Sequence, residues 1–307
     1  MVGAVSISPR VVLNSLLQLD GPRQDFIINR SRLPRSLLAL MTGGALALSG
    51  AIIQALLRNP LASPKIIGIN SGAALSVLMV TLLAPELGRG WFPLIATLGG
   101  LAAVALVYVM AELGPVSPAR LALIGVAVGF ACDAGVDFIL VTADTYVVSS
   151  PLVWLTGSLW ARGWSHVNHV APFLIPLSVI ALLMMHQLDL IRLGAVQATS
   201  LGQHVRSMRA LLLLIATLLA AISVSAVGVL GFVGLMAPHI ARRLVGGQHW
   251  HLLPVAMLVG AALVLAADAI GRAVAPPIEI SAGILTALLG APFFVFIMLT
   301  NGAEDTT

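Results

Sequence analysis

The sequence predicts an all-α protein, a polytopic transmembrane helical bundle in which nine spans are visible. Of its 307 residues, 59% are hydrophobic and only 9% are charged, whereas a soluble domain carries about 25% charged residues. The mean hydropathy is +1.04. The apolar runs are long and do not alternate strictly between apolar and polar residues, so they favour helices over the strands of a membrane barrel.

The first span is predicted at residues 36–57, a stretch without a charged side chain. About 22 residues at about 1.5 Å each cover the hydrocarbon layer of about 30 Å. Gly43, Ala47 and Gly50 recur near helical spacing. We therefore expect this helix to have a face that a neighbouring helix approaches closely.

The later apolar runs predict eight further spans, at about residues 66–83, 91–111, 121–141, 165–185, 210–227, 230–245, 253–270 and 281–300. The stretch 210–241 has no formal charge but is too long for one span, so it is divided at its glycines and at Pro238. The predicted organisation is an extracytoplasmic segment at 1–30, a membrane domain at 31–303 and a tail at 304–307. Within 1–30, Ser8 and Pro9 predict the start of a short surface helix.

The arginines predict which side of the membrane each loop occupies. If the chain crosses the membrane nine times, the loops from Arg58 onward carry eight basic residues on the side of Arg58 and three on the other side. Because cytoplasmic loops are enriched in Lys and Arg, the Arg58 side is predicted to be cytoplasmic. The arginines at positions 10 to 35 run against this count, since they would lie outside. Either a further span precedes Met1, or these arginines have a role outside the cytoplasm.

Several classes of function are excluded by what the sequence lacks. The single cysteine, Cys132, excludes an internal disulfide and a cysteine-based zinc site. The only lysine, Lys65, does not belong to a phosphate-binding Walker loop, so nucleotide hydrolysis would need a partner. There is no HExxH motif for an intramembrane metalloprotease. The net charge of +4 reflects membrane topology rather than binding to nucleic acid.

Motifs over some 270 residues resemble the FecCD-type permease subunits of bacterial ABC importers for ferric siderophores, haem and vitamin B12. The motifs that carry the resemblance are Arg32-Leu33-Pro34-Arg35, Arg58-Asn59-Pro60-Leu61-Ala62, Ser200-Leu201-Gly202, Gly231-Phe232-Val233-Gly234-Leu235, Pro238-His239, Ala267-Asp268, Glu279 and Gly290-Ala291-Pro292-Phe293-Phe294. The stretch from Trp154 to Trp160 is most similar to the ferric-citrate or siderophore branch. The family has ten spans, and because its first should lie just before Gly3, we expect the reading frame to begin upstream of Met1.

The resemblance implies a set of partners and no cofactor or resident metal. The chain would pair with an identical or sister permease subunit in the lipid of the bacterial inner membrane. Two ABC ATPase subunits would bind its inner face, and a periplasmic substrate-binding protein would deliver an iron(III) chelate to its outer face.

The resemblance also implies roles for three groups of residues. Arg32, Arg35 and Arg272 would dock acidic residues of the binding protein, although interfacial snorkelling or an i,i+4 pair between Arg272 and Asp268 would also explain them. The polar segment 186–209 would contact the ATPase through a short helix that glycine ends, at Gly194, Ala195, Ala198, Ser200, Leu201 and Gly202. The remaining motif residues would be structural, at helix ends: Arg58, Asn59, Pro60, Pro238, His239, Asp268 and Glu279.

Two further expectations come from single positions. The family usually has proline where this chain has Ser281, which should loosen the start of the last helix. His249 and His251 are expected in a solvated loop rather than at a metal.

A different class of function remains open, because Asp133 and Asp137 share a helix face inside the fourth span. Asp133 and Asp137 are interpreted as groups at the edge of a pore or as hydrogen-bonded structural groups. In the alternative, together with Asp268, they would be the proton relays of a proton-coupled secondary transporter.

Overall fold

The structure is a computed structural model that describes residues 8, 10–11, 14, 26–87, 89–114, 117–143, 151–274 and 278–301. The described residues form helices and no strand, which confirms the all-α prediction. The elements, with η for 3-10 and π turns, are η1 (Phe26–Arg32), α3 (Leu33–Leu57), η2 (Pro64–Ile67), α4 (Ile69–Leu83), η3 (Arg89–Trp91), α5 (Phe92–Glu112), α6 (Pro118–Thr142), α8 (Trp164–Leu183), α9 (Met185–Leu193), α10 (Ala195–Ser200), α11 (Val205–Val227), α12 (Val233–Val245), α13 (His249–Ala273) and α14 (Ala282–Asn301). Of the helix expected after Ser8 and Pro9, the structure describes only Arg10, Val11 and Asn14, which are helical. The tail at 304–307 lies outside the described residues.

The predicted spans each correspond to a helix in the described part of the chain, but their lengths differ from the prediction. Six helical segments are long and apolar enough to cross a membrane. The 15 residues of α4 and the 13 of α12 extend only about 22 Å and 20 Å, short of the hydrocarbon layer of about 30 Å. The first span also begins earlier than predicted, because a helix is continuous from Phe26 to Leu57. Arg32 and Arg35 therefore lie within this helix and not ahead of it.

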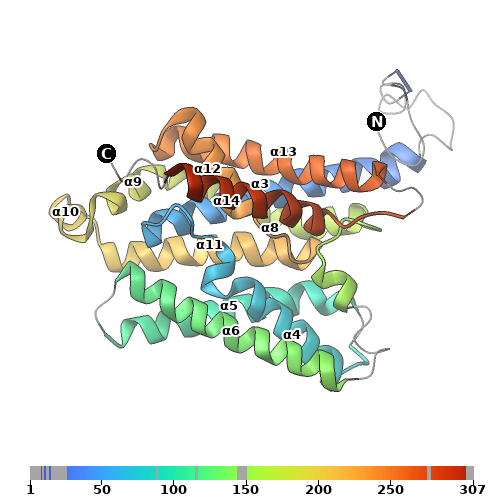
Figure 1. The fold of residues 1–307 in the computed structure, drawn as a ribbon, viewed down its shortest axis with the longest axis horizontal. Coiled ribbons are helices and arrows are strands. Elements are labelled where there is room, and N and C mark those ends of the chain that lie inside the picture. Colours follow the sequence, from blue (N-terminus) through green and yellow to red (C-terminus); the bar gives the residue numbers. More distant parts are fainter. Residues whose placement is uncertain are drawn as a thin grey trace.

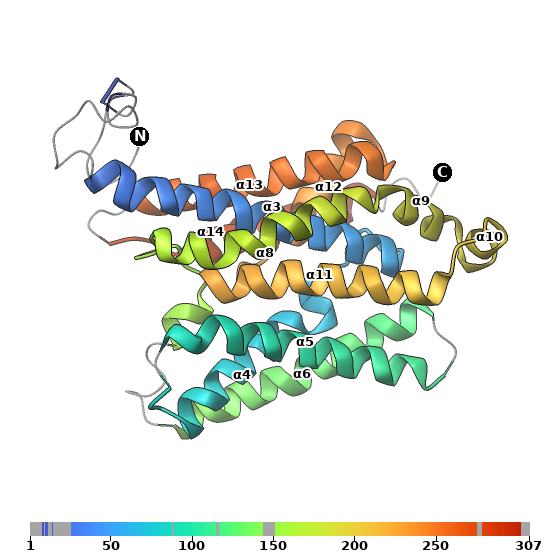
Figure 2. The same cartoon turned by 180° about the vertical axis from the view of Figure 1, so that it is seen from behind.

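Helix α3 is the centre of the bundle. It is flanked by α8, α11, α12 and α13, as Figures 1 and 2 show. Its predicted small-residue face is confirmed: a Cβ atom built on Gly43 would lie 2.4 Å from the Gly260 carbonyl oxygen, and one on Gly50 would lie 1.8 Å from that of Gly234. Ser49 adds a hydrogen bond of 2.6 Å to the Ala216 carbonyl oxygen. Backbones thus approach closely where no side chain intervenes.

The Gly50 contact predicts a stability effect. Gly50→Ala forces α3 and α12 apart and should destabilise the protein by about 1–3 kcal/mol, the usual cost of overpacking. Gly129→Ala on α6 is the matched control, since its new Cβ would lie 3.6 Å from the Gly68 Cα atom, an ordinary contact. Thermal unfolding in detergent, followed by size-exclusion chromatography, should show a lower Tm for the Gly50 variant alone. Equal Tm values for both variants would contradict the packing described here.

Helices α4, α5 and α6 form a second group on the other side of α11 (Figures 1 and 2). Helix α4 begins beside the middle of α6, because Gly68 lies against Gly129 and Gly125. Gly68 has φ +79°, a backbone conformation that glycine adopts without steric cost. The turn at η2 therefore places the start of α4 among helices and not at a surface.

The bundle has two ends of different character. The Arg35 end carries the start of α3, and Trp164 at the start of α8 joins it by donating a hydrogen bond of 2.7 Å to the Asn29 carbonyl oxygen. The α10 end carries α9 and α10, which extend beyond the other helices (Figures 1 and 2). Most of the loop arginines that were predicted to share one side lie at the α10 end, where Arg58 donates to the Ile191 carbonyl and Arg206 pairs with Glu112.

Candidate functional site

Four charged side chains meet at the Arg35 end, and we call them the Arg35 cluster: Arg35, Asp268, Arg272 and Glu279. Arg35 contacts Asp268 through Nε at 2.9 Å and Nη2 at 2.7 Å, and it contacts Glu279 through Nη1 at 2.8 Å. Arg272 Nε lies 3.1 Å from Asp268 Oδ2, so the predicted i,i+4 pair is formed. The cluster joins α3, α13 and the segment that leads into α14.

Burial makes the cluster more than a set of surface ion pairs. The Asp268 side chain is 1% exposed and the Arg35 side chain 11%. A buried carboxylate is costly unless it is paired and hydrogen-bonded, and here two guanidinium groups satisfy it. All three side-chain nitrogens of Arg35 donate hydrogen bonds to Asp268 or Glu279. Arg272 contacts Asp268 through Nε, and its Nη atoms have no hydrogen-bond partner among the described residues. Arg32, one helical turn before Arg35, is also buried.

The start of α14 is anchored more firmly than the sequence predicts. The Ser281 hydroxyl donates to the Thr156 carbonyl oxygen at 2.7 Å and to the carbonyl of Gly157, and the Gly283 N–H donates to the Gly157 carbonyl at 2.8 Å. The expectation that serine in place of proline loosens this region is therefore wrong. The hydroxyl that proline lacks ties α14 to the segment around residue 157.

The predicted coupling segment 186–209 forms the α10 end. Helix α10 spans Ala195–Ser200, with Leu201 as its C-cap. Gly202 follows with a φ of +83°, and its N–H donates to the Thr199 carbonyl at 2.9 Å, as in a glycine-capped helix. Ala198 is buried, whereas Val196 and Leu201 are 77% and 61% exposed. Gly194 is buried at the junction with α9. Exposed apolar side chains on a projecting helix fit a groove on another protein.

Helix α9 is fastened to the start of α13. The Asp189 carboxylate lies 2.5 Å from His249 Nδ1 and accepts the His249 backbone N–H at 3.2 Å. Arg192 donates to the Gly247 carbonyl oxygen at 2.7 Å. His249 is buried and opens α13, so the expectation of a solvated loop is wrong for this residue. The sequence does not predict this contact, because Asp189 and His249 are far apart in the chain.

Of the other motif residues, Arg58, Asn59 and Pro60 lie at a helix end, whereas Pro238 and His239 lie in the middle of α12, so the expectation of a helix end is wrong for these two. Arg58 ends α3, and the Asn59 side-chain oxygen accepts the Leu61 N–H at 2.9 Å in the turn that contains Pro60. Pro238 lies inside α12. His239 is buried with its ring edge-on to that of Phe293, at a centroid distance of 5.9 Å, and neither ring nitrogen has a partner among the described residues.

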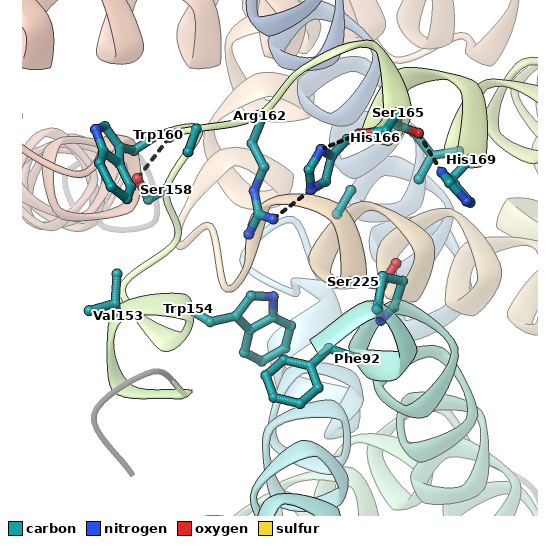
Figure 3. Close-up of a pocket in the computed structure, with 15 residues that line it drawn as sticks. Phe92, Val153, Trp154, Ser158, Trp160, Arg162, Ser165, His166, His169 and Ser225 are labelled. Atoms are coloured by element: carbon teal, nitrogen blue, oxygen red, sulfur yellow. Dashed lines mark hydrogen bonds between the residues drawn. The ribbon is translucent and has the colours of Figure 1, made fainter. Parts of the chain in front are cut away.

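A cavity of about 720 Å³, which we call the Arg162 pocket, opens at the Arg35 end. It lies between the first turns of α5 and α8 and the last turn of α11. Figure 3 shows Arg162 reaching toward Trp154, with His166 beside its guanidinium group. Arg162 Nη1 donates to His166 Nε2 at 2.8 Å, while His169 Nδ1 donates to the Ser165 carbonyl oxygen. Burial lowers the pKa of Arg162 from its ordinary value. The sequence marked the stretch from Trp154 to Trp160 only by its resemblance to the ferric-citrate or siderophore branch and did not predict this pocket.

These features define a multi-pass helical membrane protein with a projecting helix at one end and a charged cluster at the other. The model of the FecCD transport family matches residues 1–300. The chain belongs to this family.

Individual relatives agree with this placement. The chain is 43% identical over 297 residues to the Fe(3+)-citrate import system permease protein YfmE of Bacillus subtilis, a match that covers 97% of this chain and 89% of the relative. It is 42% identical over 279 residues to the Fe(3+) dicitrate transport system permease protein FecD of Escherichia coli, covering 91% and 87%. It is also 34% identical over 305 residues to the iron(3+)-hydroxamate import system permease protein FhuG of Bacillus subtilis, covering 97% and 91%.

Solved structures share the fold. A metal-chelate type ABC transporter in an inward-facing conformation superposes with a TM-score of 0.85 and 32% identity, covering 94% of this chain and 96% of that one. PsaBC from Streptococcus pneumoniae superposes with a TM-score of 0.63 at 18% identity, covering 89% and 92%, which shows likeness of fold alone.

Proposed function

We propose that the chain is the transmembrane permease subunit of an ABC importer that moves an iron(III) chelate of the siderophore type across the bacterial inner membrane. Ferric citrate is the favoured cargo, because the relatives YfmE and FecD carry Fe(3+)-citrate names at 43% and 42% identity. Helix α10 is the observation that carries the proposal, since exposed Val196 in the helix and exposed Leu201 directly after it project beyond the bundle. Two ATPase subunits would bind this helix, and a second permease subunit would complete the pore.

A docking surface for a periplasmic binding protein is proposed at Arg32, Arg35 and Arg272. Guanidinium groups offer planar forks to acidic side chains of a partner and steer its approach. Arg272, with its Nη atoms unpaired among the described residues, would contact the partner directly. Arg35 would act through the ion pairs that hold Arg272 and Asp268 in place.

Reversing the charge at Arg272 tests this surface. Arg272→Glu should lower the apparent affinity for the binding protein at least about tenfold, because like charges facing each other cost several kcal/mol. Arg272→Lys is the control that keeps the charge and should retain most of the affinity. Binding-protein-stimulated ATPase activity of the assembled importer measures both. If the binding protein stimulates the ATPase activity of the Arg272→Glu variant as much as that of the wild type, Arg272 is not part of the docking surface.

The alternative of a proton-coupled carrier finds less support in this structure. The Asp268 side chain is 1% exposed and forms ion pairs with both Arg35 and Arg272, which gives it a structural role in the Arg35 cluster. Asp133 is half-buried and Asp137 exposed on α6, where both would face a partner subunit or a pore. Uptake that vanadate stops and a protonophore spares would favour the ABC importer; the reverse pattern would favour the carrier.

A further inference from the structure

The Arg162 pocket contains hydrogen-bond donors that nothing in the described chain satisfies. Trp154 is 7% exposed, yet its indole Nε1 has no hydrogen-bond partner. The Nε atom of Arg162 is likewise buried without a partner. In Figure 3 the indole nitrogen of Trp154 lies on the side of the ring that faces Arg162. Buried polar groups in native proteins are rarely left unpaired, so two such donors in one cavity point to an absent acceptor.

The charges around the cavity specify an anionic acceptor. Arg162 carries a full positive charge and donates a hydrogen bond to His166, and His169 lines the same cavity further from the guanidinium group (Figure 3). No carboxylate is found among the described residues that line the cavity. The helices α5 and α8 both begin here, and the positive ends of their dipoles favour an anion.

The backbone that presents Arg162 is strained. Ala161, which also lines the cavity, has φ +56°. In this left-handed region a residue with a Cβ atom is strained, because the Cβ atom comes too close to the following carbonyl oxygen. Such strain persists where the surrounding structure enforces it and gathers at ligand sites. Here it holds the Arg162 side chain over the cavity.

The geometry points to a carboxylate-binding subsite in this pocket, in which Arg162 and the Trp154 indole N–H bind a carboxylate of an anionic chelate, with His169 at the edge. The proposal rests on the importer function above and deepens it. The pocket lies at the same end as the Arg35 cluster, since α8 is bonded to Asn29. A chelate released by a docked binding protein would therefore meet this subsite first. The segment that carries Trp154 is also bonded to the start of α14 through Gly157, so an occupied subsite is in contact with a neighbouring helix.

Direct binding of iron(III) citrate to the full chain in phosphatidylcholine nanodiscs tests the subsite. The wild-type chain should bind it saturably. Arg162→Gln should bind about 10- to 100-fold more weakly, since it loses a charge-assisted hydrogen bond, and Trp154→Phe about 2- to 10-fold more weakly, since it loses a neutral one. Trp250→Phe removes an exposed indole N–H at the α10 end and should bind as wild type does. If Arg162→Gln does not fold, the affinity of Trp154→Phe for iron(III) citrate still tests the subsite.

An anionic lipid headgroup is the other source of the same chemistry, so the titration is repeated in nanodiscs that contain phosphatidylglycerol. Unchanged citrate affinity there supports the chelate subsite. Loss of citrate binding in phosphatidylglycerol would show a lipid site and overturn the proposal, as would wild-type affinity in Arg162→Gln and Trp154→Phe or no saturable binding to the wild type. The binding assay needs no ATPase, so a negative result in it would overturn the subsite but leave the proposed importer function standing. Absence of ATP-driven uptake by the wild-type importer would instead overturn the importer function.

Discussion

Asp268→Asn is expected to destabilise the Arg35 end by about 3–5 kcal/mol, the cost of removing one partner of a buried ion pair. The change leaves two guanidinium groups, Arg35 and Arg272, facing a neutral amide in a site where the replaced carboxylate is 1% exposed. Because Arg35 also holds Glu279, the approach to α14 should loosen as well. Thermal unfolding in detergent should show a lower Tm, and proteolysis should cut more readily near residue 279.

Glu279→Gln is the matched control for this prediction. Its side chain is 31% exposed and its ion pair with Arg35 is partly solvated, so its loss should cost only about 0–1 kcal/mol. The double variant Arg35→Gln with Asp268→Asn should be less destabilised than the sum of the single variants, since the two residues form one network. Additive losses, or wild-type stability of Asp268→Asn, would show that the cluster does not hold the end together.

Inserting Gly-Ser after Ala198 should abolish coupled uptake while the protein still inserts into the membrane. The insertion breaks α10 at its buried residue and detaches the exposed Val196 from Leu201. Loss of a coupling free energy of about 1–3 kcal/mol corresponds to about a 5- to 150-fold effect, and a flexible joint at this point removes the coupling. Uptake of radioactive iron(III) citrate by cells that express the complete importer measures the result.

The same insertion after Glu86 is the control, because residues 85–87 form an exposed turn at the Arg35 end. That variant should retain most of its uptake. Normal uptake by the Ala198 insertion would mean that α10 does not transmit the work of the ATPase. Equal loss in both variants would mean that insertion disturbs the fold wherever it is placed.

The sequence predicted the parts of the fold that depend on local pattern. Long uncharged runs located the helices, and the spacing of Gly43, Ala47 and Gly50 predicted the close crossing of α3. Glycine at position 202 predicted the end of α10. Helix lengths were predicted less well, since α4 and α12 are short because turns at Gly68 and around residue 231 lie among packed helices.

The candidate sites depend on contacts between distant residues, which a pattern does not reveal. Nothing in the chain order indicates that Arg35 lies against Glu279 or that Asp189 lies against His249. Motif resemblance marked Arg35, Asp268 and Glu279 as separate helix-end or docking residues, and the structure joins them in one cluster. The stretch from Trp154 to Trp160 was marked by its resemblance, but nothing in it indicated a pocket at Arg162; the strained Ala161 and the unpaired Trp154 nitrogen are visible only in three dimensions.

The most direct test of energy coupling through α10 is iron accumulation in reconstituted vesicles, with the permease alone or together with its ATPase and binding protein. We predict that iron(III) citrate accumulates against its gradient only when ATPase, ATP and binding protein are all present. Accumulation by the permease alone, driven by an imposed pH gradient, would contradict this account.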